Sequence, residues 1–406
     1  IMNKIFRIGL SVAAVIFVSA CNDAEYGVGG VHAFLNEGTQ SAGVNGTVVS
    51  LGETGADYSL TVTLTDRASE DAVFKFVADE SVLEVYNREQ SSGYKALPAD
   101  YYDLGGEILI PAGEYSADPV SIHISTLPND LTGTPLALPV RLEKVSGNVD
   151  PTPVTSSYVI ALETVLVNDL AQFNGASGLR AENFNGSFPT GFTIEVKFQV
   201  SNTANRNRDV FSNGASVLFR FEDPQSDQGD VKAHSAVQFQ GSPAYINPDP
   251  LVGFDVNCWQ HLAYTWDGSS GYLYYNGQQV GTKAITSSDV GDGSFPVASW
   301  FGGATGDGGH GTGSSWWIGC DIMFTEARIW SVVRTPEQIA NNMSFVGADS
   351  NGLEGYWRIN RASYTDNGDG TYQFEDLTGK GHPLVSSTNF EWNENISSED
   401  TETPWI

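Results

Sequence analysis

Apolar and polar residues alternate in short runs along the first half of the chain, with a period of two. Such alternation is typical of β-strands that bury one face and expose the other. Turn-forming residues at 111–113 and 128–129 separate the runs, and no sustained helical period is present. Several short strands joined by turns favour a β-sandwich. The expected strands are residues 58–64, 120–124, 136–142 and 158–162.

The second half shows the same period and two further local signals. Residues 192–200 alternate between an apolar set and a polar set that contains Glu195, so one face of this strand is expected to be wet. The segment 272–277 ends in Asn-Gly, which favours the type I′ turn of a hairpin. One helix is expected, because Thr335 and Gln338 form a capping box around a proline at the first helical position. The chain is therefore predicted to be all-β, with two domains.

Four segments of the first half resemble the DUF1735 family, an N-terminal domain of Bacteroides-type surface lipoproteins. The resemblance implies that residues 30–163 form a spacer or platform without assigned chemistry. The segments are FKFV (74–77), LPADYY (97–102), ILIPAG (108–113) and LPVRL (138–142).

Four motifs of the second half, in their order and spacing, resemble the concanavalin A-like laminin-G family. The resemblance implies a jelly-roll sandwich over residues 168–393, preceded by a short link at 164–170 and followed by an acidic tail, 394–406. Two departures from the family pattern are Ile322, where a glycine is usual, and an insertion at 360–373. The motifs are FTIEV (192–196), WQHLAYTWDG (259–268), EARIW with RTPEQI (326–339) and LEGYW with DLTGKGH (353–382).

The N-terminus is predicted to be a lipoprotein signal. A basic start and an apolar run of about a dozen residues suit a signal peptide rather than a membrane span. The run ends in Val-Ser-Ala-Cys21, which resembles the bacterial lipobox, so residues 1–21 are expected to carry a lipidated Cys21 before a linker, 22–29. Residues 22–25 (NDAE) resemble the surface-export signal of Bacteroides-type lipoproteins, which implies a lipid-anchored protein exposed on the outer membrane. The alternatives are an incidental cysteine after a secretory signal and an ordinary acidic linker.

The charge balance points toward neutral ligands. The chain has 20 basic and 49 acidic residues, and removal of residues 1–20 with Lys4 and Arg7 would shift its formal charge from −29 to −31. Such a surface repels nucleic acid and anionic lipid, so membrane attachment would depend on acyl chains. The charge also favours solubility, whatever the ligand.

Two cysteines remain beyond the lipobox, and metal binding stays open. An oxidising compartment favours a disulfide between Cys258 and Cys320, but the sequence does not give the Cα separation that a bridge requires. The laminin-G resemblance implies that a structural calcium ion can sit at the sandwich rim, near which Asp209 and Asn213 fall. No metal ligand is assigned, and the loop 366–370 is expected to be a hairpin turn rather than a calcium loop.

Catalytic patterns are absent from the sequence. Retaining glycosidases need two carboxyls about 5 Å apart, and the Glu-x-Asp-x-x-Glu strand of the glucanase relatives does not occur. Glu195 is followed on its face by Lys197 and Gln199, so this face is expected to hold one carboxylate without a partner. Gly-x-Ser-x-Gly is also missing. The protein is therefore not expected to be an enzyme, with glycoside hydrolysis as an alternative.

Aromatic residues around a glycine-rich loop are the best candidates for ligand contact. Exposed rings stack on the apolar faces of sugars, and polar groups bind the hydroxyls. Trp300, Trp316 and Trp317 flank a loop that contains His310 and Asp307. Strand alternation would bury one residue of each aromatic pair, which leaves Trp316 and His310 as the expected exposed residues and Asp307 as a hydroxyl acceptor.

Tyr245 and Asn247 lie in a proline-flanked loop that could join this rim. The leading hypothesis is a non-catalytic surface protein that captures a neutral oligosaccharide for outer-membrane import proteins and hydrolases, and the alternative is a structural or adhesive module that binds protein. Five residues of the family motifs are expected to pack in the core instead: Trp259, His261, Trp266, Trp330 and Trp357.

Overall fold

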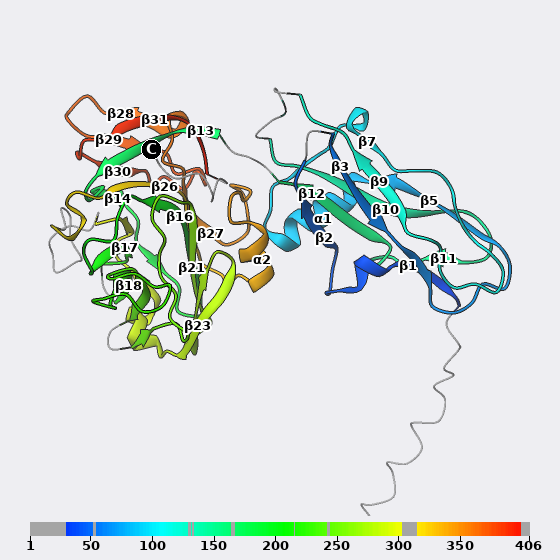
Figure 1. The fold of residues 1–406 in the computed structure, drawn as a ribbon, viewed down its shortest axis with the longest axis horizontal. Coiled ribbons are helices and arrows are strands. Elements are labelled where there is room, and N and C mark those ends of the chain that lie inside the picture. Colours follow the sequence, from blue (N-terminus) through cyan, green and yellow to red (C-terminus); the bar gives the residue numbers. More distant parts are fainter. Residues whose placement is uncertain are drawn as a thin grey trace, which may run out of the picture.

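The computed structural model describes residues 30–51, 54–128, 131, 134–163, 167–214, 216–241, 244–302 and 315–398. The predicted signal segment and its Cys21 lie outside these residues. Two β-rich bodies lie side by side, the first coloured blue to cyan and the second green to red (Figure 1). Within the described ranges, no helix has both the length and the apolar character needed to cross a membrane.

The first domain is a β-sandwich, as predicted. A six-stranded sheet has the order β2-β12-β10-β5-β8 with β6 beside β10, and two three-stranded sheets, β11-β1-β4 and β3-β9-β7, share one apolar core with it. The expected strand 58–64 is two strands in different sheets, and the N–H of Thr61 between them donates to the Glu37 carboxylate. The elements are β1 (His32–Leu35), η1 (Asn36–Thr39), β2 (Asn45–Val49), β3 (Ala56–Leu60), β4 (Val62–Leu64), β5 (Ala72–Ala78), α1 (Glu80–Gln90), β6 (Lys95–Ala96), η2 (Ala99–Tyr101), β7 (Tyr102–Asp103), β8 (Ile108–Ile110), β9 (Val120–Ile124), β10 (Leu136–Ser146), β11 (Asp150–Pro151) and β12 (Ser157–Leu162).

Helix α1 contradicts the expectation that the first half contains no helix. The side chain of Asp79 caps it by accepting a hydrogen bond from the Ser81 N–H at 3.0 Å. Its buried residues Val82, Leu83 and Tyr86 pack against Ala137, Val159 and Ala161 of β10 and β12. Three apolar residues in a helix of this length give a weak periodic signal, which is why the pattern was missed. The helix covers the second face of the six-stranded sheet.

The second domain is a jelly-roll sandwich of two large sheets. The eight-stranded sheet has the order β23-β22-β21-β16-β26-β13-β31 with β27 beside β26, and the nine-stranded sheet has the order β20-β19-β18-β17-β25-β14-β30-β29-β28. A core rich in phenylalanine and tryptophan lies between them. The elements are β13 (Val167–Asn174), β14 (Leu179–Ala181), β15 (Gly186–Ser187), β16 (Phe192–Val200), β17 (Arg208–Ser212), β18 (Val217–Glu222), β19 (Ala236–Gly241), β20 (Tyr245–Ile246), β21 (Gln260–Trp266), β22 (Ser270–Tyr275), β23 (Gln278–Ala284), η3 (Ser287–Gly293), β24 (Ser294–Phe295), β25 (Ser299–Trp300), η4 (Ser315–Trp317), β26 (Asp321–Trp330), α2 (Pro336–Asn341), β27 (Leu353–Trp357), η5 (Arg361–Ser363), β28 (Tyr364–Asp366), β29 (Tyr372–Phe374), β30 (Leu384–Ser386) and β31 (Glu391–Ser397).

The local signals of the second half are confirmed. Asn276 and Gly277 have φ angles of 46° and 75°, as a type I′ turn between β22 and β23 requires. Helix α2 begins at Pro336 with both hydrogen bonds of the Thr335–Gln338 capping box. The loop 366–370 connects the hairpin strands β28 and β29.

The polar face of β16 is buried, although the alternation predicted that it would be wet. All nine residues of the strand are buried. The segment that carries α2 covers this face, since Thr193 donates to the Val332 carbonyl at 2.8 Å and Lys197 donates to the Ser344 hydroxyl at 2.7 Å. Alternation therefore located both faces correctly but could not show that a distant segment lies on the polar one.

The expected boundaries of the jelly roll are too narrow at both ends. Strand β13 begins at Val167, inside the expected link, and pairs with β31 so that Val167 lies opposite Ser397. The acidic tail expected from residue 394 thus begins as strand, which runs to Ser397.

The two domains meet where the C-terminus of α1 contacts α2 and the turn after it. The Gln338 side chain donates to the Glu89 carbonyl at 2.7 Å, and the Asn342 side chain donates to the Gln90 carbonyl at 3.2 Å. Ser350 donates to the Ser91 carbonyl at 3.1 Å. The last carbonyls of α1, which have no partner within the helix, are therefore bonded by side chains of the other domain.

Candidate functional site

A row of polar side chains crosses the outer face of the nine-stranded sheet from β18 to β20. Arg220 Nε donates to Gln238 Oε1 at 2.8 Å, and Gln238 Nε2 donates to Asn247 Oδ1 at 2.6 Å. These residues face outward because their strand neighbours Phe219 and Phe239 point into the core. Each amide and guanidinium is held in one orientation by its neighbour, and a fixed set of donors and acceptors is suited to binding hydroxyl groups.

Ion pairs extend this row toward the beginning of β17. Arg220 Nη2 lies 2.8 Å from Glu222 Oε2, and Arg206 Nη1 lies 3.5 Å from Glu222 Oε1. Arg206 also lies 3.1 Å from Asp223. Two arginines and two acids leave no net charge on this end. We call the row Arg206, Glu222, Arg220, Gln238 and Asn247 the polar ladder.

Exposed aromatic residues stand at the two ends of the polar ladder. Tyr245, 37% exposed, lies on the same face as Asn247 because Ile246 between them is buried. Trp316, 44% exposed, lies near the other end, where its carbonyl accepts hydrogen bonds from Asn205 at 3.3 Å and Arg208 at 2.8 Å. From β17 to β20 the sheet spans about 14 Å, or three strand spacings. The structure thus places Tyr245 beside Asn247, and the backbone of Trp316 beside the loop that precedes β17, rather than in one cluster.

Four members of the polar ladder were missed from the sequence: Arg206, Arg220, Glu222 and Gln238. A usable signal was present, because residues 217–222 alternate three core residues with Leu218, Arg220 and Glu222. The pairing of Arg220 with Gln238 across two strands required the sheet register.

The expectation that Trp300 contacts a ligand is wrong. Trp300 is fully buried and packs on Phe211 with ring centroids 4.6 Å apart. Its strand β25 lies between β17 and β14 in the middle of the sheet. Phe301, which alternation would expose, is buried too, because its positive φ of 48° turns the ring back toward Phe324 in the core.

The neighbouring residues Trp316 and Trp317 face different environments, as expected, since Trp316 is exposed and Trp317 is fully buried. Both lie on the short helix η4 and not on a strand. His310 and Asp307 lie outside the described residues. The five motif residues expected in the interior are all buried: Trp259, His261, Trp266, Trp330 and Trp357.

Asp209 and Asn213, which the sequence placed near a calcium-binding rim, are buried and bonded to protein groups. Asp209 Oδ2 accepts the Gly302 N–H at 3.1 Å, and burial raises the pKa of Asp209 to about 7. The Asn213 amide donates to the Ser294 carbonyl and accepts the Val217 N–H. Across the part of the chain that the structure describes, no three His, Cys, Asp or Glu side chains gather in a cation-binding group.

Cys258 and Cys320 are free, so the disulfide left open by the sequence does not form. The two residues lie on opposite sides of β16, since Asn257 N–H bonds to Val200 and Ser201 N–H bonds to Asp321. Two strand spacings separate the flanking segments by about 10 Å, and a disulfide requires Cα atoms closer than about 7 Å.

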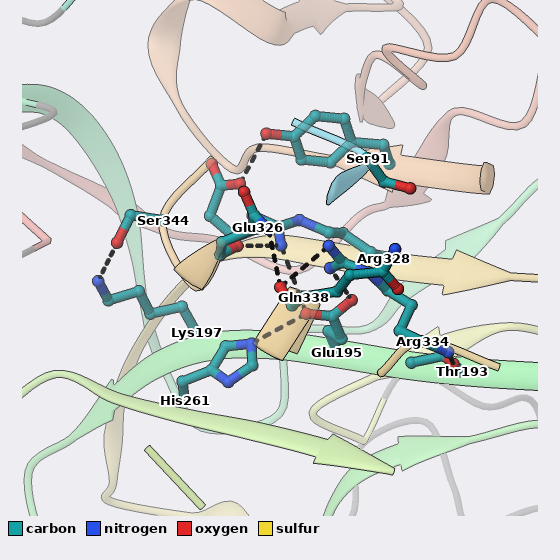
Figure 2. A network of polar contacts seen from close by, with 12 residues as sticks. Ser91, Thr193, Glu195, Lys197, His261, Glu326, Arg328, Arg334, Gln338 and Ser344 are labelled. Atoms are coloured by element: carbon teal, nitrogen blue, oxygen red, sulfur yellow. Dashed lines mark hydrogen bonds and ion pairs between the residues drawn. The ribbon is translucent and has the colours of Figure 1, made fainter. Parts of the chain in front are cut away.

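A buried charge cluster lies on the outer face of the eight-stranded sheet (Figure 2). Arg334 Nη1 lies 2.7 Å from Glu195 Oε1, and Arg328 Nη1 and His261 Nε2 lie 3.5 and 3.3 Å from Glu195 Oε2. Burial would raise the pKa of Glu195, but Arg334, His261 and Arg328 together hold it well below its usual value. Burial also lowers the pKa of His261.

Glu326 corrects the expectation that this face holds a single carboxylate. It occupies a bulge of β26 with a positive φ of 50°, which turns its side chain toward Arg328, Arg358 and Tyr356. Burial opposes ionisation, but Arg358 and Arg328 keep the pKa of Glu326 below its usual value. Both acids are about 0–1% exposed and bound by arginines. Neither carboxylate is accessible to a substrate as an acid or a base.

Comparison with known families agrees with this architecture. The second domain has the concanavalin A-like fold. Residues 173–340 match the family model described as the concanavalin A-like lectin/glucanases superfamily. Residues 29–149 match a second model, which describes an N-terminal domain. No curated protein matches the chain.

Several solved structures are similar to the chain at low identity. A Bacteroides ovatus protein described as a candidate carbohydrate-binding protein is 18% identical, with 90% of this chain and 98% of that one covered and a TM-score of 0.47. A second Bacteroides ovatus protein, of unknown function, is 14% identical over 79% and 96% of the two chains, with a TM-score of 0.26. A pentraxin of Limulus polyphemus is 13% identical over 45% and 78%, with a TM-score of 0.28.

Proposed function

We propose that this protein binds a neutral glycan on the outer face of the nine-stranded sheet without cleaving it. The observation that carries the proposal is the polar ladder, in which the Gln238 amide, 9% exposed, joins the Arg220 guanidinium to the exposed Asn247, with the exposed residues Trp316 and Tyr245 near its two ends. Sugar binding needs this combination, because rings stack on the apolar sugar faces while oriented polar groups bind hydroxyls. The family match over residues 173–340 covers the same domain.

The charges of the polar ladder favour a neutral ligand. Arg206 and Arg220 are both paired with acids, so neither offers a free positive charge to an anionic sugar. Glu222 is 7% exposed and bound by both arginines, which makes it a poor proton donor or nucleophile. We expect Kd values from millimolar to micromolar, or about 4 to 8 kcal/mol.

The test is a glycan array followed by titration of the hits, with and without calcium. Gln238→Ala should weaken binding at least tenfold, because it removes the central amide of the polar ladder. Gln278→Ala, at an exposed residue of β23 on the opposite sheet, is the control for this face. Absence of binding across a broad array would contradict the proposal. Release of reducing ends from a bound polysaccharide would replace it with a hydrolase.

The cellular role proposed is capture of oligosaccharides at the surface of the outer membrane for import proteins and hydrolases. It is supported by the lipobox at Cys21 and the acidic residues after it. Replacement of Cys21 by alanine should release the protein from membranes, and protease added to intact cells should remove the wild-type protein. A membrane-bound Cys21→Ala variant would contradict this anchor.

A further inference from the structure

A second hollow lies on the opposite sheet, away from the polar ladder. It encloses about 290 Å³ on the outer face of β21, β22 and β23, beside the segment that leads into α2. Thr265 lies opposite Tyr272 in the register of β21 and β22, and Tyr274 lies opposite Gln279 in that of β22 and β23. The four side chains therefore share one face of the sheet. We call this hollow the β22 groove.

The floor of the groove is a buried tyrosine, and its sides include an aromatic and an apolar residue. Tyr274 is buried and packs with Ala263 and with Ile339 of α2. Tyr272 is half-buried, so part of its ring faces the groove. Val333, 40% exposed, supplies an apolar wall on the α2 side. An apolar patch on each side would accept a ring whose faces carry C–H groups.

Polar groups line the groove from Asp267 at one end to Gln279 at the other, and its lining also includes Thr265, Arg334 and Thr335. Asp267 Oδ1 accepts the N–H groups of Ser269 and Ser270 and the Ser269 hydroxyl at 2.8 to 2.9 Å. Asp267 Oδ2 accepts the Tyr272 hydroxyl at 3.2 Å and keeps capacity for a further donor. Burial opposes ionisation, but the Ser269 and Ser270 bonds lower the pKa of Asp267, so it is an anion at neutral pH. Gln279 is exposed at the opposite strand and offers both a donor and an acceptor.

We propose that the β22 groove binds one neutral sugar ring, as a second site independent of the polar ladder. Its volume of about 290 Å³ is just below the roughly 300 Å³ at which the range for small-molecule sites begins, which suits a single ring rather than an oligosaccharide. Asp267 would accept ring hydroxyls, Gln279 would bind a further hydroxyl, and Tyr272 with Val333 would contact the apolar face. This inference rests on the proposed function in one respect, that the ligand is a neutral sugar. Because the two sites lie on opposite sheets, one molecule could hold two glycan ends at once.

Titration of the full-length protein with a panel of neutral hexoses and N-acetylhexosamines, monitored by saturation-transfer NMR and calorimetry, tests this site. Asp267→Asn keeps an oxygen for the Ser269 and Ser270 bonds but removes the charge, and Tyr272→Ala removes the ring. Each should weaken monosaccharide binding at least tenfold. Gln278→Ala, the exposed neighbour on β23, should leave it unchanged.

The outcomes separate this site from the polar ladder. Monosaccharide binding that survives Gln238→Ala but is lost in Asp267→Asn supports the groove. Binding that is unaffected by Asp267→Asn, Tyr272→Ala and Gln279→Ala overturns it, while loss in Gln238→Ala alone leaves the ladder as the single site. If no monosaccharide binds but oligosaccharides do, the groove proposal fails and the proposed function stands. Thermal unfolding of each variant shows that lost binding is not lost folding.

Discussion

Arg334 and Glu195 form an ion pair of 2.7 Å in the interior of the second domain, and the same guanidinium donates to the Gln90 carbonyl of the first domain at 3.4 Å. One arginine therefore connects the centre of the eight-stranded sheet with the domain junction. Arg334 follows both of its partners, Glu195 of β16 and Gln90 of α1, by more than a hundred residues in the sequence.

Glu195→Gln should destabilise the protein strongly. The substitution keeps the shape of the side chain but leaves Arg334 and Arg328 without their shared anion in a buried site. Breaking one partner of such a pair costs about 3 to 5 kcal/mol. Urea unfolding measures the change, and Glu375→Gln, at an exposed acid, should change stability by less than about 0.5 kcal/mol. Equal effects of the two substitutions would show that the buried cluster is not stabilising.

Gln338→Glu should loosen the domain junction without removing the helix cap. A carboxylate oxygen can still accept the Thr335 N–H, but it replaces the amide that donates to the Glu89 carbonyl. Loss of this bond should cost about 1 to 3 kcal/mol and speed hydrogen exchange at the end of α1. Exchange by mass spectrometry and small-angle scattering check this, with Glu337→Gln on the exposed side of α2 as control. Unchanged exchange in residues 89–93 would argue against a fixed junction.

Asp209→Asn should change the pH dependence of stability. The folded state raises the pKa of Asp209 from 3.8 to about 7, so between these values it holds a proton that the unfolded state has released. Stability then falls as pH rises through this window, by at most about 4 kcal/mol above pH 7. The variant should therefore be more stable than wild type at pH 8 and nearly equal at pH 4. Parallel unfolding curves at both pH values check this, and a constant difference would contradict the raised pKa.

Trp300→Ala and Trp316→Ala should affect different properties of the protein, its stability and its glycan binding respectively. The first removes a fully buried ring and should cost about 3 to 5 kcal/mol of stability. The second removes an exposed ring and should leave the unfolding midpoint nearly unchanged while weakening glycan binding. Urea unfolding and glycan titration of the same samples separate the two effects. Normal binding by Trp316→Ala would remove this residue from the site.

Thiol labelling should distinguish the two free cysteines. Cys258 is partly exposed and should react with iodoacetamide in the folded protein, whereas Cys320 is buried and should react only after unfolding. Mass spectrometry before and after denaturation checks this. Protection of both residues until a reductant is added would indicate a disulfide.

The sequence by itself determined the elements whose signals are local. Alternation indicated several of the strands, Asn276-Gly277 specified a turn, and Thr335 with Gln338 specified a helix start, because each depends on neighbours within a few residues. The family motifs then identified the jelly roll of the second domain, and their tryptophans proved to be core residues.

The tertiary structure decided which faces are covered and which side chains meet. The segment from Val332 to Ser344 lies on the polar face of β16, α1 covers the six-stranded sheet, and Trp300 lies in the middle of its sheet. Arg220 meets Gln238 only through the register of β18 and β19. Burial and pairing of this kind depend on segments distant in sequence, and a strand's own alternation carries no information about what lies against it.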